Sequence, residues 1–501
     1  MLEREVKLGA GPAFHLPDLS GVVEGASMGP PEAARLETVY FDTPDLRLAR
    51  WGVSLRYRAR EGWTLKLAPG IAEPGRPQLL LERDELTFPG GPKKPPAAAL
   101  APIRAYVRGS ELVPVARLST VRRRLRLTGA DGGRIADVTD DEVSVRDGRR
   151  VAARFREIEV ELAGENGSEA ALTPIVTRLR DAGAGVPDPT PKHVRALGPR
   201  AMEPPEVTPL PVSSASTARD VIRSVLAESV AALLHHDPLV RTSKDPEAIH
   251  QARVATRRLR SHLRTFGSLL EPEWNEPLRS ELGWIAMALG LVRDREVLLE
   301  RLQEKAKSLP PTDARSAASL LQVLAQDVES LRRKLEADLD APRYIELLEQ
   351  LVAAAHGPHA TLEADQPASQ VLPALATGPW RRLQSAVKKL AEPPQDSELH
   401  RIRILAKRAR YAAEAVAPVV GDDAAAFARA AAKLQTVLGE HQDSVTAQEW
   451  LRSVRAAGRR AFVAGELIAM ERQAGQKARD EWAKAWKGLQ RKRVRRWMTG
   501  I

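Results

Sequence analysis

The sequence contains no cysteine among its 501 residues, which excludes disulfide bonds, thiolate nucleophiles, cysteine-bound zinc and iron–sulfur clusters. No apolar run reaches the roughly 20 residues that a transmembrane helix requires. The N-terminus carries charge from its third residue on and shows no apolar signal region, so we expect a cytoplasmic protein without a membrane partner. Aromatic residues make up only 4% of the chain, which leaves few side chains for stacking on nucleic acid bases.

Charged residues are plentiful and follow regular patterns. The chain has 76 Lys+Arg against 65 Asp+Glu, a formal net charge of +11, and 43% hydrophobic residues, as expected of a globular protein with two to four domains. This net charge indicates a polyanionic partner only weakly, so the placement of the charges along the chain carries the argument.

The character of the sequence changes near residue 200. Residues 1–200 contain short runs of alternating polar and apolar residues between Pro, Gly and Asp, typical of an antiparallel sheet or a closed barrel. Residues 201–216 are rich in proline and serine and predict a linker. Residues 217–501 show helical periodicity and predict an all-α domain. We therefore expect an α+β protein of two domains.

The helical part contains an internal repeat. When His250 is aligned with His400, basic residues recur at the same offsets in both copies, and a Leu-Gly pair followed by an aspartate recurs about forty residues further on. Two landmarks in the same order and at nearly equal separation indicate a duplicated helical unit. The proline-containing residues 357–379 predict a loop between the two halves.

Each copy places a basic stripe beside an apolar seam on one helix. At 100° per residue the first stripe is about 80° wide and contains no acidic residue, whereas Glu414 interrupts the second. A solvated helix face is the alternative, but it normally mixes both signs because like charges at i,i+3 and i,i+4 repel. The residues predicted to bind a polyanion are His250, Arg253, Arg257, Arg260 and Arg264 in the first copy and His400, Arg403, Lys407 and Arg410 in the second.

These stripes suit a chain of phosphates. Arginine offers a fork of donors that matches phosphate oxygens, and histidine adds a donor near neutral pH. The stripes lack interleaved aromatic residues, and no zinc-finger or RNP-type motif occurs, which disfavours nucleic acid. Linear inorganic polyphosphate, which has charge and no bases, is the predicted partner.

This half of the chain resembles the CHAD family, the conserved histidine α-helical domain, over about residues 217–497. The segments that carry the resemblance are IHQARVATRRLRSHLRTF (249–266), LGLVRDREVLLERL (289–302), LHRIRILAKRARYAAEAV (399–416) and LGEHQDSVTAQEWL (438–451). The resemblance implies two pseudo-symmetric four-helix units that bind inorganic polyphosphate through basic helical surfaces.

Several strand-like runs among the first 200 residues carry charge on one face. The first and last of these runs are rich in carboxylates, whereas those between them are rich in Arg and Lys. The charged faces could point toward water, as in a half-exposed sheet, or into the lumen of a barrel, and the alternation within one strand is the same in both cases. If the charged faces turn inward, carboxylates could bind a hard divalent cation and the basic residues could bind phosphates, an arrangement suited to phosphoryl transfer.

This part resembles the CYTH, or triphosphate-tunnel, family over about residues 1–200. The resemblance is carried by EREVK (3–7), YFDTPDLRLARWGVSLRYRAREGWTLKL (40–67), REIEVEL (156–162) and PKHVRAL (191–197). It implies an eight-stranded antiparallel β tunnel with flanking helices that binds triphosphate together with Mg²⁺ or Mn²⁺ and usually hydrolyses it.

The resemblance also implies roles for individual residues. The implied catalytic residues are Glu3, Glu5 and Lys7, the substrate-binding residues Arg56, Arg58, Lys66, Arg122, Arg124 and Lys192, and the metal ligands Glu3, Glu5, Asp140, Glu159 and Glu161. The sequence does not decide between Asp140 and Asp141, and we place the ligand at Asp140. The predicted function is metal-dependent hydrolysis of inorganic triphosphate to pyrophosphate and phosphate, with polyphosphate held by the helical domain. The alternative is a non-catalytic polyphosphate-binding scaffold, and association with polyphosphate granules is a further hypothesis.

Overall fold

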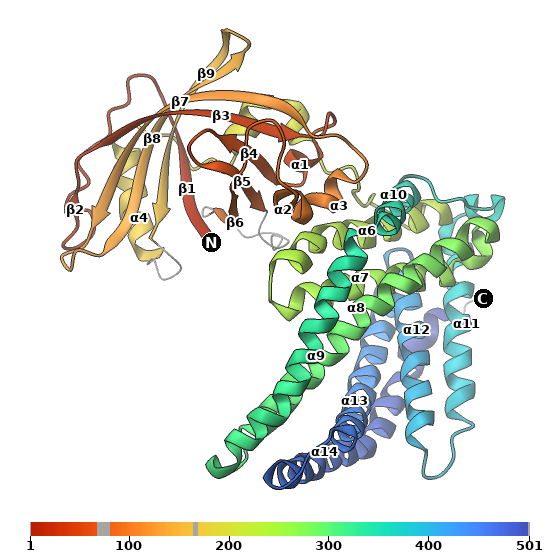
Figure 1. Ribbon diagram of the computed structural model, residues 1–501. Coiled ribbons are helices and arrows are strands. Elements are labelled where there is room, and N and C mark those ends of the chain that lie inside the picture. Colours follow the sequence, from red (N-terminus) through yellow and green to blue (C-terminus); the bar gives the residue numbers. More distant parts are fainter. Residues whose placement is uncertain (1, 68–80, 164–168, 499–501) are drawn as a thin grey trace. The chain divides into compact units, whose positions relative to one another are not determined.

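The computed structural model describes residues 2–67, 81–163 and 169–498 (Figure 1). The chain divides into two compact units, Met1–Glu206 and Val207–Ile501. Each unit has its own secondary structure and its own apolar core.

The N-terminal unit is a β-barrel. Its strands are β1 (Leu2–Ala10), β2 (Ser27–Met28), β3 (Glu32–Asp42), β4 (Ser54–Arg58), β5 (Gly62–Leu67), β6 (Leu81–Phe88), β7 (Val113–Thr128), β8 (Arg134–Asp147) and β9 (Arg150–Leu162). Within the described residues, antiparallel pairing runs β7-β3-β4-β5-β6-β1-β9-β8 and closes between β8 and β7, while β2 adds a short pairing to β7. The predicted eight-stranded antiparallel tunnel is confirmed.

Helices flank this barrel. They are α1 (Arg47–Arg50), α2 (Ala97–Leu100), α3 (Arg104–Val107), α4 (Leu172–Asp181) and α5 (Lys192–Leu197). The main apolar core of the unit lies outside the barrel wall, where Val6, Val138 and Val160 of the strands pack with Ile175 and Leu179 of α4. Because side chains alternate between the two faces of a strand, burying these residues against α4 turns the charged residues between them toward the lumen.

A smaller apolar cluster lies on the luminal face. Leu118 of β7 and Val143 of β8 share this face with the charged residues further along the same strands, and they cluster with Tyr40 and with Ala196 and Leu197 of α5. Helix α5 is therefore anchored by apolar contacts at its C-terminal end.

The C-terminal unit is all α-helical (Figure 1). Its α-helices are α6 (Ala218–Thr242), α7 (Pro246–Thr265), α8 (Pro272–Ala306), α9 (Ala314–Asp340), α10 (Pro342–His356), α11 (Ala368–Val387), α12 (Asp396–Val420), α13 (Asp422–Ser453), α14 (Arg459–Leu489) and α15 (Lys492–Arg495). His250 lies on α7 and His400 on α12, so the repeat pairs α6–α9 with α11–α14 and confirms the two four-helix units.

The apolar seam predicted beside each basic stripe is buried. In the second copy Ile402, Ala406 and Ala409 of α12 pack with Phe427 and Leu434 of α13 in one core cluster. The basic residues of the stripe are left at the edge of this seam. None of the described helices combines the length and the apolar character that crossing a bilayer would need.

Candidate functional site

The charged faces of the barrel strands meet in its lumen. A cavity of about 60 Å³ lies there, and among the described residues that line it there is no Leu, Ile or Val. The predicted residues that line this cavity are Lys7, Arg56, Lys66, Arg122, Glu159, Glu161 and Lys192. The inward arrangement is therefore the one that the structure adopts.

Two lysines bind a group of buried carboxylates at the centre of the lumen. Lys192 Nζ lies 2.9 Å from Asp141 Oδ2, 2.7 Å from Glu157 Oε1 and 2.8 Å from Glu159 Oε1. Lys7 Nζ lies 3.1 Å from Glu5 Oε1 and also contacts Glu159. Strands β1, β8 and β9 and helix α5 thus bring these residues, widely separated in the chain, to one point.

The pKa values reflect this network. Burial would raise the pKa of Glu159, but Lys192, Lys7 and Arg122 hold it well below its ordinary value. Burial would likewise lower the pKa of Lys192, whereas Glu159, Glu157 and Asp141 raise it well above its ordinary value. Glu159 and Lys192 are therefore both charged at neutral pH.

Arg122 extends the network from β7. Its Nε and Nη2 lie 2.8 and 2.6 Å from the two carboxylate oxygens of Asp141, and Nη2 also lies 3.0 Å from Glu159 Oε2. Across the barrel, Lys66 Nζ lies 3.0 Å from Glu85 Oε2, and Arg56 Nη2 lies 3.9 Å from the same oxygen. Cations therefore border the cavity from several strands.

The placement of Asp140 in the metal site is wrong. Its carboxylate lies on the opposite face of β8, where Arg156 Nε and Nη2 approach its two oxygens at 2.8 Å each and Arg123 Nη1 lies 3.3 Å away. The reason is strand alternation: Val138 faces the apolar core outside the wall, so Asp140 faces outward as well. Asp141, the other residue considered, occupies the luminal position.

Three predicted residues have luminal positions but bind partners outside the central network. Arg58 donates from Nε to Thr38 Oγ1 at 2.9 Å and pairs with Glu61. Arg124 pairs with Asp137, and Glu161 lies 3.3 Å from Arg134 Nη2. The side chain of Glu3 lies outside the described residues, although its backbone pairs with that of Arg83.

The sequence interpretation missed several luminal residues. Glu157 is fully buried against Lys192, Arg83 lines the cavity and Glu85 binds Lys66. The signal was present, because Arg83 and Glu85 alternate along β6 and Glu157 is the first acid of the Glu-x-Glu-x-Glu run in β9. His193 stacks on Tyr40 at 5.0 Å, and burial together with nearby cations lowers its pKa to about 3, so this imidazole is neutral.

The donor atoms of the lumen suit a hard divalent cation. They are carboxylate oxygens, which Mg²⁺ and Mn²⁺ prefer over nitrogen or sulfur. Within residues 2–67, 81–163 and 169–498, no group of three carboxylate or imidazole side chains is placed to hold an ion by itself.

A second charged site lies between the two helical copies, where the basic stripes of α7 and α12 meet. Arg257 donates from Nη2 to Tyr411 Oη at 2.9 Å across the two helices. Burial lowers the pKa of Lys407 to about 7, and Arg257, Arg403 and Arg253 act in the same direction, whereas Asp294 opposes them. We call Arg253, Arg257, Arg403, Lys407 and Arg410 the central basic cluster.

The Gly-x-x-x-Asp landmark of the repeat lies against this cluster. A Cβ atom at Gly290 of α8 would lie 3.7 Å from Arg253 Nε, and one at Gly439 of α13 would lie 3.6 Å from Arg403 Nε. These are ordinary contact distances, so both arginines lie directly against the backbone of the neighbouring helix at the two glycines. Asp294, one turn beyond Gly290, accepts a hydrogen bond from Arg253 Nη1 at 2.7 Å and orients it.

The other residues predicted in the stripes lie around this cluster. Burial lowers the pKa of His250, and Arg293, Arg257 and Arg253 act in the same direction, so it adds a donor mainly in its neutral form. Arg264 is exposed. Partial desolvation lowers its pKa, and the positive charges of Arg408, Arg279 and Arg260 lower it further. The structure thus adds further arginines of the helical unit to the stripe on α7. Arg410 pairs with Glu414 at 2.6 Å, and His400 is half-buried on α12.

Lys407→Met is expected to stabilise the helical unit by on the order of 2 kcal/mol near pH 6, because it removes a buried charge from among arginines. The pKa of Lys407 is about 7 in the folded protein against 10.5 for an ordinary lysine, so the unfolded chain binds more protons between these values. Native stability therefore rises with pH through this window, and the advantage of the variant disappears there. Chemical denaturation followed by the helical circular dichroism signal at several pH values measures the difference. An advantage that stays constant with pH would contradict the burial of this charge.

Comparison with known proteins supports the assignment of both units. The CYTH domain family matches residues 1–186, and the CHAD domain family matches residues 224–452. Two uncharacterized proteins of Mycobacterium tuberculosis, MT2285 of strain CDC 1551 and Rv2226 of strain H37Rv, are each 31% identical over 514 residues, covering 94% of this chain and 93% of theirs.

Two solved structures were also found. PptA from Streptomyces chartreusis is 26% identical with a TM-score of 0.47, covering 54% of this chain and 99% of its own. The CHAD domain from the plant Ricinus communis is 23% identical with a TM-score of 0.42, covering 59% of this chain and 96% of its own. With both domain families matched and relatives similar along nearly the whole length, the chain belongs to the family of proteins in which a CYTH domain is followed by a CHAD domain.

Proposed function

We propose that the barrel hydrolyses inorganic triphosphate to pyrophosphate and phosphate with Mg²⁺ or Mn²⁺, and that the helical unit binds inorganic polyphosphate. The CYTH family includes triphosphatases and related phosphoryl-transfer enzymes and is typically metal-dependent. The observation that carries the proposal is the lumen itself, where buried carboxylates are surrounded by Arg and Lys from several strands. A closed site with both charge types suits a substrate that is a polyanion bound with a cation.

The basic residues of the lumen would bind and orient the phosphates. Arg56 and Lys66 share the carboxylate of Glu85, and a guanidinium has five N–H donors, so this pair retains capacity for phosphate oxygens. Arg122 is held by Asp141, which fixes the direction of its donors. These contacts place the phosphates and neutralise their charge, which is the main contribution that a protein makes to phosphoryl transfer.

The carboxylates would hold the metal. Glu5 and Glu159, with Glu3 and Glu161 as the remaining members of the implied set, supply oxygen donors, and Lys7 and Lys192 keep the described ones charged and in place. When bound, the metal would neutralise phosphate charge and lower the pKa of a water molecule that attacks phosphorus. The apolar cluster of Leu118 and Val143 lies on the luminal face beyond the charged residues.

A binding function without turnover is the second candidate. It is favoured by the ion pairing of the central lysines, because Lys192 alone binds three carboxylates that would otherwise be available to a metal. In that case the barrel captures triphosphate or the end of a polyphosphate chain, and the protein acts as a polyphosphate scaffold, including at polyphosphate granules.

Hydrolysis of triphosphate by the full chain distinguishes the two functions. With Mg²⁺ or Mn²⁺ we expect pyrophosphate and phosphate in equal amounts, and with a chelator we expect neither. Phosphate release no greater than in a protein-free control, together with measurable binding of triphosphate, would reject the enzyme and leave the binding function.

A further inference from the structure

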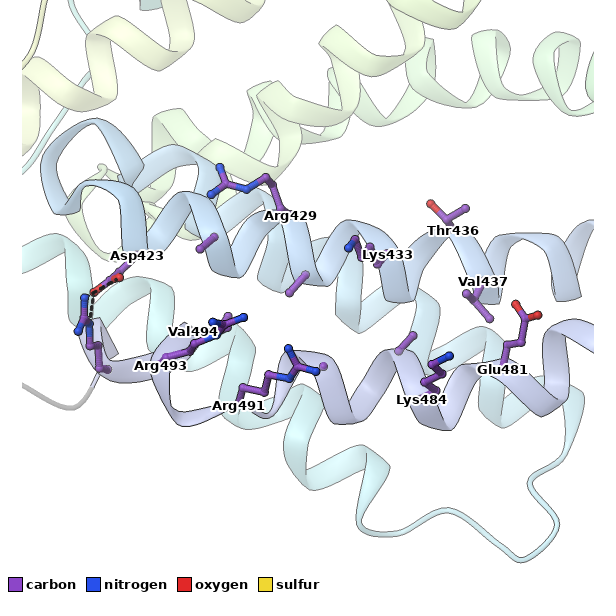
Figure 2. A pocket seen from close by; sticks show the side chains of 15 residues that line it. Asp423, Arg429, Lys433, Thr436, Val437, Glu481, Lys484, Arg491, Arg493 and Val494 are labelled. Atoms are coloured by element: carbon purple, nitrogen blue, oxygen red, sulfur yellow. Dashed lines mark hydrogen bonds and ion pairs between the residues drawn. The ribbon is translucent and has the colours of Figure 1, made fainter.

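A third basic site lies in the second half of the helical unit, outside the two sites described above. A groove of about 1120 Å³ runs between α13 and α14 and reaches α15 (Figure 2). Its basic side chains come from both sides: Arg429 and Lys433 from α13, Lys484 from α14, and Arg491 and Arg493 from the C-terminal segment. The strongly basic end of the sequence thus forms part of a groove.

These basic side chains lack acidic partners. Within the described ranges 2–67, 81–163 and 169–498, none of the five forms an ion pair or a side-chain hydrogen bond. The groove contains two acidic residues, and one of them, Asp423, already binds Arg496, whose Nε lies 2.6 Å from its Oδ2. Such a concentration of like charge is unfavourable in the free protein and indicates an anionic ligand.

The shape and lining of the groove favour a thin chain. Its floor is formed by small residues, among them Ala426, Ala430, Ala485 and Gly488. The lining positions on α13 extend from Asp423 to Val437, about 21 Å of helix, so an elongated ligand can contact several cations in turn. No aromatic side chain lines the groove within the described residues, so it offers no platform on which nucleic acid bases could stack.

The internal repeat shows that the charge of Lys433 is not required by the fold. Alignment of Gly290 with Gly439 pairs Ala430 and Lys433 of α13 with Glu281 and Trp284 of α8. In the first copy Arg343 of α10 covers these two positions: its Nε lies 2.7 Å from Glu281 Oε2, and its guanidinium lies 4.3 Å from the ring of Trp284. In the second copy these two positions carry Ala430 and Lys433, both of which line the groove, and Lys433 has no acidic partner among the described residues.

We propose that the groove between α13 and α14 is a separate binding site for linear inorganic polyphosphate. The choice of ligand rests on the proposed polyphosphate binding of the helical unit, but the residues are different ones. A long chain could therefore be held at two places on the same unit, which raises its overall affinity through the high local concentration at the second place.

The test uses the full chain and inorganic polyphosphate of defined length. Together, Lys433→Glu, Lys484→Glu and Arg491→Glu are expected to weaken polyphosphate binding about tenfold. The number of counterions released on binding, measured from the salt dependence of the affinity, should fall by about two because three phosphate contacts are lost. Arg472→Glu, Lys477→Glu and Lys487→Glu form the matched control, since these exposed residues of α14 do not line the groove and the net charge changes equally. Circular dichroism confirms that all variants are folded.

A variant with Arg257→Glu and Lys407→Glu separates this proposal from the proposed function. We expect this variant to retain some polyphosphate binding and to lose it when the three groove substitutions are added. That result supports the groove as a polyphosphate-binding site. If the groove variant and its matched control bind polyphosphate with equal affinity, the groove is not a polyphosphate-binding site. This conclusion does not depend on whether the central basic cluster binds polyphosphate. A groove variant that loses binding of single-stranded RNA while keeping its binding of polyphosphate also overturns the proposal and identifies nucleic acid as the ligand.

Discussion

Glu5→Gln is expected to reduce phosphate release from triphosphate by about 10²- to 10³-fold while the barrel remains folded. Glu5 is buried in the lumen, 3.1 Å from Lys7 Nζ. Burial would raise its pKa, but the charge of Lys7 lowers it below the ordinary value, so the side chain is a carboxylate at neutral pH. Glutamine keeps the size and removes the charge that would bind the metal. Initial rates with Mg²⁺, and the melting temperature of the same preparation, measure both effects.

A pair of neighbouring substitutions provides the control for this experiment. Asp141→Asn removes a luminal carboxylate that binds Lys192 and Arg122, and it should lower activity strongly. Asp140→Asn removes a carboxylate of the same strand that faces the outer side and binds Arg156, and it should affect stability more than activity. Unchanged activity of Glu5→Gln, or equal activity losses in the two aspartate variants, would contradict the assignment of the lumen as the site of hydrolysis.

The alternation of charge predicted the luminal face of most strands, but not of β8. In β8 the acids Asp140, Asp141 and Glu142 follow one another, so this stretch has no period of two. Its phase is set by Ala136 and Val138, which pack in the apolar core outside the barrel wall. Ala136 and Val138 predict which face of β8 is luminal only if the apolar core of this unit is known to lie outside the barrel wall.

The prediction of a loop at residues 357–379 was wrong in part, because α11 begins at Ala368 and includes Pro373 and Pro379. Proline lacks the amide hydrogen that a helix uses, so its presence normally indicates a break. Here burial of Leu372 and Trp380 in the helical unit holds the segment in a helix. A tertiary contact of this kind has no signal in the local sequence.

The positions of the basic stripes on their helices could be predicted from the sequence, but not the meeting of the two stripes. Helical periodicity places Arg257 and Lys407 beside their apolar seams, whereas only the packing of α7 against α12 brings them together. The same holds for Gly290 and Gly439, whose spacing was recognised as a landmark without a reason. Their contact with arginines of a neighbouring helix depends on tertiary packing.

Arg257→Glu together with Lys407→Glu is expected to weaken polyphosphate binding about 100-fold, because two charge-assisted contacts are replaced by repulsion. Both side chains lie in the central basic cluster, where the positive charges of Arg253 and Arg403 also act on them. The same substitutions relieve repulsion among the basic residues, so the variant should be folded. The number of counterions released on binding should fall by about 1.5, because two phosphate contacts are removed at roughly 0.7 ion each.

The matched control is Arg381→Glu with Arg401→Glu, which changes the net charge equally at exposed positions of α11 and α12. Isothermal titration with polyphosphate at several salt concentrations gives affinity and salt dependence together. If the two double variants bind equally well, then net charge and not the central basic cluster determines binding. Duplex DNA of matched charge provides the second comparison. Selectivity for polyphosphate requires that the spacing of the half-buried arginines fits the narrower phosphate chain better than it fits DNA. Equally tight binding of DNA and polyphosphate by the unaltered protein would show that the cluster recognises negative charge in general.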